Sequence, residues 1–279
     1  MSRATGPMGA FIAALVAALT AYGASEAAQV SAANPGSAEA ALAKLPPGYL
    51  PRAALPDSLA LLPPPPAPGS AAMQRDEEAR QSVVPLRGGP RWARAASDAD
   101  LAFPHAAGIF SCATGVEISR EATPHLYGLL GRMLIDVGLS TYGAKNHYNR
   151  TRPFVAHSEA TCLPRDEAML RGDGSYPSGH SAAGWGWALV LAELVPDRAD
   201  AILQRGRDFG QSRLVCDVHW QSDIDAGRVI ASAAVARLHA DPGFKSALEE
   251  ARAEIATARQ SGAPPAARCT AETAALAMH

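Results

Sequence analysis

Residues 174–195 read GSYPSGHSAAGWGWALVLAELV, a polar turn that leads directly into a long apolar segment. The apolar part runs from Ser181 to Val195 and stops at Pro196, which cannot continue a helix. Three further segments have apolar residues at helical spacing: 126–137, 199–209 and 219–239. No strand alternation or internal repeat competes with these segments. The sequence therefore predicts an all-α fold.

The composition narrows the class of protein. The 279 residues are 48% hydrophobic and 19% charged, so the chain can bury a sizeable core. Its formal net charge of −2 gives no overall basic field of the kind that attracts nucleic acid phosphates or anionic lipids. We therefore expect a single helical domain without a nucleic-acid-binding site.

The N-terminal residues have the layout of a secretory signal peptide. Arg3 precedes an apolar run from about Gly9 to Ala21, and small residues follow it. The run is too short for a membrane-spanning helix, which needs roughly 20 apolar residues. We expect cleavage of residues 1–27, no stable membrane anchor afterwards, and a periplasmic or secreted protein. A retained anchor or a buried core helix is the alternative.

Proline is concentrated in the part that follows. Thirteen of the 22 prolines precede residue 91, and the run at 63–66 excludes a regular helix there. The leucines beside this run are too apolar for a pure linker, so we expect residues 28–95 to pack along the surface of a domain that spans 28–260. Residues 261–279, rich in Ala, Pro and Thr, look like a flexible tail.

The first group of chemically informative residues lies at 145–153, KNHYNRTRP. Pro153 biases Arg152 out of the helical region. If the segment is helical as far as Arg150, Lys145 and Arg152 point to a similar side, because seven residues make about two turns. This arrangement predicts a cationic cradle. The alternative is a solvated helix terminus, where the helix dipole favours cations.

The second group is the turn at 174–180. It places unpaired backbone N–H groups at a helix N-terminus, where they and the helix dipole attract an anion. Gly179 allows that anion to approach closely, and His180 stands beside it to exchange a proton. The alternative is an ordinary helix cap made by Ser178.

The third group lies at 212–223, SRLVCDVHWQSD. His219 and Asp223 are four residues apart, so on a helix the carboxylate accepts from one imidazole N–H and leaves the other nitrogen as a base or nucleophile. Arg213 joins them only if the helix breaks between 213 and 219. A metal site made by Cys216, His219 and Asp223 is disfavoured, because no second Cys/His pair with zinc-like spacing exists.

Together the three groups resemble the signature of the type 2 phosphatidic acid phosphatase (PAP2) superfamily. That signature is Lys, six residues, Arg-Pro; then Pro-Ser-Gly-His; then Ser-Arg, five residues, His, three residues, Asp. Every fixed position is matched in this chain, by Lys145, Arg152, Pro153, Pro177, Ser178, Gly179, His180, Ser212, Arg213, His219 and Asp223. The surrounding residues 61–66, 90–92 and 220–223 look like those of bacterial class A non-specific acid phosphatases. The likeness covers nearly all of the mature chain.

This resemblance implies an all-α acid phosphatase domain at 28–260, shared in type with the vanadium haloperoxidases. It implies metal-independent hydrolysis of small phosphate monoesters through a phosphohistidine, without a cofactor. By the same resemblance His219 is the nucleophile, Asp223 orients it and His180 protonates the leaving group. The residues implied to bind the phosphoryl oxygens are Lys145, Arg152, Ser178, Gly179 and Arg213. Phosphate transfer to alcohols is a possible second activity, and we expect a homo-oligomer.

The four cysteines would lie in an oxidising compartment if the chain is exported, and sequence alone leaves three pairings open. We expect Cys162 to pair with Cys216, because Cys162 falls on a loop near the expected active-site helices. Cys112 then pairs with Cys269.

Two other classes of function compete with this interpretation. A vanadium-dependent haloperoxidase uses a similar constellation to hold vanadate, but such enzymes are generally much longer. A non-catalytic phosphate-binding protein would ordinarily have lost its nucleophile or its general acid, and this chain has kept both.

Overall fold

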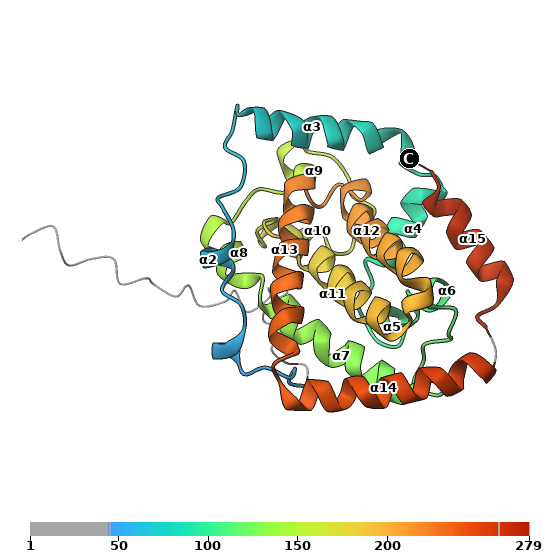
Figure 1. Ribbon diagram of the computed structural model, residues 1–279. Coiled ribbons are helices and arrows are strands. Elements are labelled where there is room, and N and C mark those ends of the chain that lie inside the picture. The colour runs from blue at the N-terminus through green and yellow to red at the C-terminus, as the bar shows by residue number, and fades with distance from the viewer. Residues whose placement is uncertain (1–43, 45, 262, 279) are drawn as a thin grey trace, which may run out of the picture. The chain divides into compact units, whose positions relative to one another are not determined.

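The computed structural model describes residues 44, 46–261 and 263–278, which belong to one compact unit. All the secondary-structure elements assigned within these residues are helices, which confirms the predicted all-α fold (Figure 1). The signal peptide expected at 1–27 lies outside the described residues. No helix in the described ranges has the length and apolar content needed to cross a membrane.

The α-helices are α2 Ser58–Leu61, α3 Ala71–Val83, α4 Pro90–Asp98, α5 His105–Gly108, α6 Ser111–Thr114, α7 Pro124–Leu139, α8 Tyr142–Tyr148, α9 Pro153–Ala156, α10 Glu167–Arg171, α11 Gly179–Leu194, α12 Ala199–Val215, α13 Gln221–Leu238, α14 Pro242–Ser261 and α15 Ala266–Leu276. Three short 3₁₀ helices are η1 Arg52–Ala54, η2 Val84–Leu86 and η3 Pro196–Arg198.

Helix α11 is the centre of the packing, with α7, α12 and α13 against it (Figure 1). Its glycines and alanines let neighbouring helices approach closely. An added Cβ at Gly184 would lie 2.2 Å from Cδ1 of Phe209, and one at Gly206 of α12 would lie 2.4 Å from Cβ of Ala188. Trp187 fills the adjoining core and donates from Nε1 to the carbonyl oxygen of Leu130 at 2.9 Å. This packing fixes the ends of α11, α12 and α13 relative to one another.

Among the described residues that precede α5, five segments are helical despite the prolines: η1, α2, α3, η2 and α4. Helix α3 contacts α12 and α13, and α4 contacts α12. The segment around the proline run is held by Tyr176, whose hydroxyl donates to the carbonyl oxygen of Pro63 at 2.8 Å. The N-terminal residues from α3 onward therefore lie against the helices that carry the sequence motifs.

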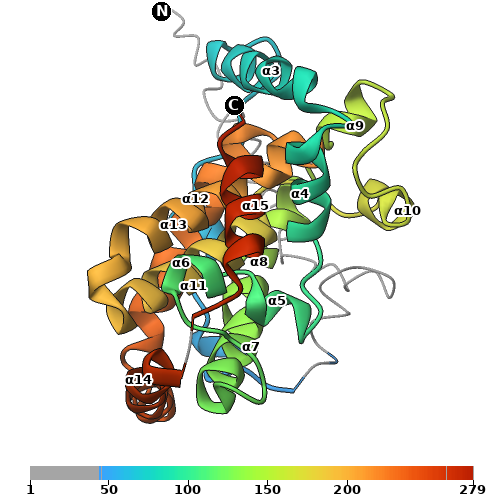
Figure 2. The same ribbon diagram turned by 90° about the vertical axis from the view of Figure 1, so that its right-hand side faces the viewer.

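The prediction of a flexible tail at 261–279 is wrong for most of that range. Ala266–Leu276 form helix α15, which packs on α4 (Figure 2). A disulfide joins Cys269 of α15 to Cys112 of α6. Composition alone suggests a tail, because it does not reveal that Cys269 is bonded to Cys112, 157 residues earlier in the sequence.

We expect Gly206→Ala to lower the free energy of unfolding by about 2 kcal/mol, because overpacking at a close helix contact forces the helices apart. The matched control is Gly128→Ala in α7, where an added Cβ meets nothing within 4 Å. That change should raise the free energy of unfolding by about 0.5–1 kcal/mol, since alanine has the better helix propensity. Urea denaturation with both disulfides intact measures the two values. Equal stability of the two variants would contradict this account of the α11–α12 contact.

Candidate active site

The three sequence motifs meet at the ends of α8, α11, α12 and α13. Lys145 in α8 donates from Nζ to the carbonyl oxygen of Gly174 at 2.7 Å, which joins the first motif to the second. The backbone N–H of Ser178 donates to the carbonyl oxygen of Asp223 at 2.9 Å, which joins the second to the third. The structure thus brings together residues that lie far apart in the sequence.

The expected break between Arg213 and His219 is present. Helix α12 ends at Val215 and α13 begins at Gln221. The intervening chain turns back, because the backbone N–H groups of Val218 and His219 both donate to the carbonyl oxygen of Arg213, at 3.2 and 3.3 Å. His219 therefore precedes α13 instead of lying on it, and it still reaches Asp223 in the first turn of α13.

The two nitrogens of His219 have different surroundings. Nδ1 lies 3.4 Å from Oδ2 of Asp223, and Nε2 lies 3.1 Å from Nη1 of Arg152. A guanidinium only donates, so Nε2 is the nitrogen without a proton and Nδ1–H faces the carboxylate. Burial and the charges of Arg152 and Lys145 hold the pKa of His219 well below its ordinary value. The ring is therefore neutral, with a lone pair directed at the cations.

Asp223 is fully buried and tied to its surroundings on both oxygens. Oδ2 accepts from the backbone N–H of Trp220 at 2.9 Å, and Oδ1 accepts from Nη1 of Arg150 at 2.6 Å. Burial raises the pKa of the Asp223 carboxyl, and the charge of Arg150 opposes that rise. Nη2 of Arg150 also donates to Oδ2 of Asp76 in α3, at 2.7 Å. Arg150 is thus held between two carboxylates.

Three buried cations act on His219: Arg152 contacts its Nε2 atom, and the charges of Lys145 and Arg213 also lower its pKa. Arg152 donates to the carbonyl oxygens of Val218 and Asp173 at 2.9 Å, and its Nη2 reaches Oδ2 of Asp173 at 3.0 Å. Burial lowers the pKa of Lys145 to about 8. Within the described residues, Nε and Nη1 of the fully buried Arg213 have no hydrogen-bond partner. Buried guanidinium groups are ordinarily paired, so these N–H groups point to an anionic ligand with several oxygens.

The N-terminus of α11 supplies the remaining donors. Ser178 is the N-cap, as the capping interpretation expected, and its Oγ accepts from the backbone N–H of Ser181 at 3.2 Å and from the Ser181 hydroxyl at 2.9 Å. Its own hydroxyl proton stays available to a ligand. Gly179 begins the helix, so its N–H is among those that have no acceptor within the helix.

His180 lies in the first turn of α11, half-buried at the surface. Its Nε2 is 3.0 Å from the carbonyl oxygen of Ala99. A carbonyl only accepts, so Nε2 carries the proton and Nδ1 is the nitrogen that remains to take one up. Burial and the charge of Arg213 hold the pKa of His180 well below its ordinary value. Both imidazoles are neutral in this state.

Both cysteine pairs that we expected are present, Cys162–Cys216 and Cys112–Cys269. The first bond fixes the end of α12 just before His219, whereas the second lies away from the cations. The metal site considered from the sequence lacks its thiolate, because Cys216 is bonded to Cys162. No group of three or more His, Cys, Asp or Glu residues within the described ranges has the arrangement of a metal site.

Sequence reasoning missed Asp76 and Asp173, and it gave Arg150 no separate role. Arg150 lies inside the first motif, so its position was a usable signal. Asp76 comes from α3 and meets Arg150 only because α3 folds against α13. No local pattern around Asp76 marks it.

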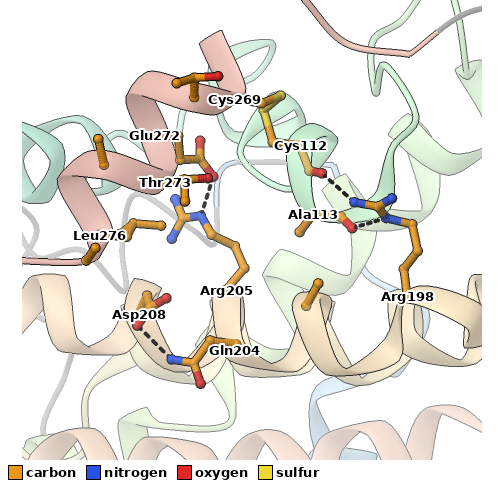
Figure 3. A pocket seen from close by; sticks show the side chains of 14 residues that line it. Cys112, Ala113, Arg198, Gln204, Arg205, Asp208, Cys269, Glu272, Thr273 and Leu276 are labelled. Carbon is orange, nitrogen blue, oxygen red and sulfur yellow. Dashed lines mark hydrogen bonds and ion pairs between the residues drawn. A yellow bond between two sulfur atoms is a disulfide. The ribbon is translucent and has the colours of Figure 1, made fainter. Parts of the chain in front are cut away.

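A groove of about 980 Å³ beside α15 is a second concave region (Figure 3). Its arginines are already paired: Arg205 donates to Glu272 at 3.0 Å, and Arg198 donates to the carbonyl oxygen of Ala113 at 2.7 Å. The groove therefore lacks the unpaired donors that surround His219, and the candidate active site is the motif cluster.

Comparison with known proteins finds a family model and several relatives that match this chain. The PAP2 superfamily model matches residues 123–245, which contain all three motifs. A non-specific acid phosphatase of Providencia stuartii is 47% identical over 209 residues, covering 75% of this chain and 84% of the relative. A non-specific acid phosphatase of Salmonella typhimurium is 45% identical over 195 residues, covering 70% and 78%. An acid phosphatase of Zymomonas mobilis is 44% identical over 209 residues, covering 75% and 79%.

The pKa of Lys145 gives a test of the cation cluster by ligand binding alone. We expect Kd for sulfate, a dianion at every pH used, to rise more steeply above a pH of about 8, the value to which burial lowers the pKa of Lys145. Above that pH the free protein loses the charge, so Kd should rise by up to about tenfold per pH unit. Calorimetry measures Kd for the wild type and for Lys145→Met, which should bind weakly without this inflection. Parallel curves for the two proteins would show that Lys145 does not bind the anion.

Proposed function

The chain belongs to the PAP2 superfamily, among the non-specific acid phosphatases, and on that premise we propose that it hydrolyses phosphate monoesters through a phosphohistidine at His219. The observation that carries the proposal is the orientation of His219. Nδ1 lies 3.4 Å from Oδ2 of Asp223, a proximity that does not amount to a hydrogen bond in this state, and Nε2 lies 3.1 Å from Nη1 of Arg152, where a phosphoryl group would bind. A neutral imidazole held in this way is an activated nucleophile.

Substrate binding uses the donors that surround this lone pair. Arg213 has unpaired N–H groups, and the Nη1 atom of Arg152 exchanges its contact with His219 for a phosphoryl oxygen. Lys145, the Ser178 hydroxyl and the Gly179 N–H complete the set. Charge in phosphoryl transfer is spread over three equatorial oxygens, and donors fixed before binding stabilise it without reorganisation. These fixed cations are the basis for proposing that hydrolysis needs no metal ion.

The covalent step forms the bond between Nε2 of His219 and phosphorus and breaks the bond between phosphorus and the ester oxygen. The imidazole gains positive charge, which the Asp223 carboxylate balances through Nδ1–H. Burial raises the pKa of Asp223, and the charge of Arg150 favours the ionised carboxylate by opposing that rise. We therefore assign Arg150 a supporting role in holding Asp223, and Asp223 the role of orienting His219.

His180 supplies the proton that the departing oxygen needs. In the free protein its pKa is depressed by burial and by Arg213. A bound phosphoryl dianion offsets the charge of Arg213 and raises the pKa of His180, so the imidazole becomes charged when substrate is present. Protonation of His180 becomes easier as the pH falls, which favours an acidic optimum. Water then attacks the phosphohistidine, with His180 accepting its proton.

Export from the cytoplasm is part of the proposal. The two disulfides join all four cysteines, and such bonds persist in oxidising compartments. The expected signal peptide is consistent with that location. The haloperoxidase alternative gains no support from the relatives, whose names are those of acid phosphatases.

We expect His219→Ala to reduce kcat by about a thousandfold or more, because no covalent intermediate forms without the imidazole. Wild-type protein that is incubated with ³²P-labelled phosphomonoester in EDTA and then denatured should hold acid-labile label on His219. His219→Ala should hold none. Unlabelled wild type together with an active His219→Ala variant would overturn the mechanism. Activity lost in EDTA and restored by a divalent metal would overturn only its metal independence.

The general acid is tested separately by varying the leaving group. Glycerol 2-phosphate releases an alkoxide that needs a proton, whereas p-nitrophenyl phosphate releases a stable anion. We expect His180→Asn to lower kcat/KM for glycerol 2-phosphate by about 10²–10⁴-fold and to affect p-nitrophenyl phosphate far less. His219→Ala serves as the control and should damage both alike. Equal losses for His180→Asn would assign His180 to phosphate binding instead.

A further inference from the structure

Helix α15 is attached to the rest of the fold at two separate places. Near its start, the Cys269–Cys112 disulfide and an exposed ion pair between Arg268 and Glu117, at 2.6 Å, anchor it to the region of α6 (Figure 3). One turn further on, Glu272 points inward toward α4 and α12. The helix runs beside α4, as Figure 2 shows.

Glu272 binds two guanidinium groups that are themselves bound to a buried carboxylate. Its Oε1 accepts from Nε of Arg205 at 3.0 Å, and its Oε2 lies 3.1 Å from Nη2 of Arg94. Arg205 and Arg94 also contact Asp98, through Nη1 at 3.2 Å and Nη2 at 3.1 Å. Asp98 is fully buried and Arg205 is nearly so. Two carboxylates, Asp98 and Glu272, are thus shared between the same two guanidinium groups.

Asp98 connects this cluster to the candidate active site along two short paths. Its Oδ2 accepts from the hydroxyl of Ser212 at 2.6 Å, and Ser212 immediately precedes Arg213. The next residue, Ala99, provides the carbonyl that accepts from Nε2 of His180 at 3.0 Å. The carboxylate of Asp98 therefore fixes the backbone at Ala99 and the end of α12 together.

Loss of the Glu272 charge would unbalance the cluster. Asp98 would then be the remaining carboxylate between Arg94 and Arg205, with Arg91 close by on the Ser212 hydroxyl at 3.0 Å. One carboxylate would then be left for both guanidinium groups, and buried charge that is only partly compensated is costly, so the arginines would move toward solvent or toward other acceptors. Asp98 would lose the contacts that orient it, and the Ala99 carbonyl would move with it.

We propose that Glu272 is a positioning residue and that α15 is a clamp that holds Asp98, and through it His180, in place for proton transfer. This inference rests on the proposed function, because it assigns His180 the role of general acid. The Cys112–Cys269 bond keeps the clamp attached, so the C-terminal segment is a working part of the site instead of an appendage.

Glu272→Gln tests the clamp, and Glu117→Gln is the matched control. Each change removes one carboxylate charge from an ion pair that attaches α15, but the Glu117–Arg268 pair is exposed, and no contact within the described residues joins Glu117 to Asp98. We expect Glu272→Gln to lower the ratio of kcat/KM for glycerol 2-phosphate to that for p-nitrophenyl phosphate at least fivefold. Glu117→Gln should leave the ratio within twofold of wild type.

Melting temperatures of both variants separate positioning from stability, because a purely structural role lowers the melting temperature without changing the ratio. An unchanged ratio for Glu272→Gln overturns the clamp, and so does an equal loss on both substrates. If that variant does not fold, Arg94→Gln removes the same connection from its other side and should lower the ratio likewise. The His180→Asn variant shows whether a negative result contradicts only the clamp or also the proposed role of His180 as general acid. If that variant lowers the ratio and Glu272→Gln does not, only the clamp is wrong; if neither lowers it, the role of His180 is wrong.

Discussion

Positive charge buried at one point is the constraint on which the rest of this structure depends. Lys145, Arg152 and Arg213 lie with their charges inside the protein, where an unpaired cation is costly. The chain meets that cost with fixed acceptors for two of the three, the carbonyl oxygen of Gly174 for Lys145 and Asp173 for Arg152. Two nitrogen atoms of Arg213, Nε and Nη1, have no such acceptor among the residues that the structure describes. The fold therefore stabilises the cations and still leaves unsatisfied donors directed at one place.

The helix packing determines where that place is. Close approach of α11 and α12 at Gly184 and Gly206 sets the end of α12 near the start of α11, and the turn after Val215 carries the chain back to His219. The Cys162–Cys216 disulfide fixes that turn on one side, and Arg150 fixes Asp223 on the other. The ends of packed helices, instead of a long loop, therefore hold the side chains of the candidate site. Electrostatic stabilisation of a transition state requires groups that are fixed in this way before the substrate binds.

Features of the fold and of the site can be predicted from the sequence when they depend on interactions between residues that are close together in the chain. The all-α fold depends on helical periodicity within each segment, and the sequence contains that directly. The sequence also reveals the motif residues, because each motif is a short, continuous stretch. Only the position of Arg213 beside His219 depends on a further feature, the break in the helix after Val215. Asp76, Asp98 and Glu272 were missed, because each acts through a partner supplied by another element and no local pattern marks it. The error about the C-terminal tail has the same origin: the ion pairs and the disulfide that order α15 join residues that are distant in sequence.

The same buried cations also divide the work between the two histidines. Burial together with cationic neighbours lowers the pKa of both His180 and His219, so neither ring is charged before a ligand arrives. In the mechanism that we propose, this is the reactive state of His219, and Asp223 compensates the charge that forms later. For His180 it would be the inactive state, which changes when a bound anion offsets Arg213. A phosphate ester brings that negative charge with it, whereas a neutral molecule of the same shape does not. In the proposed mechanism, binding of the phosphate ester thus creates the acid that its own leaving group requires, so that selectivity for phosphate and catalysis would arise from one electrostatic arrangement.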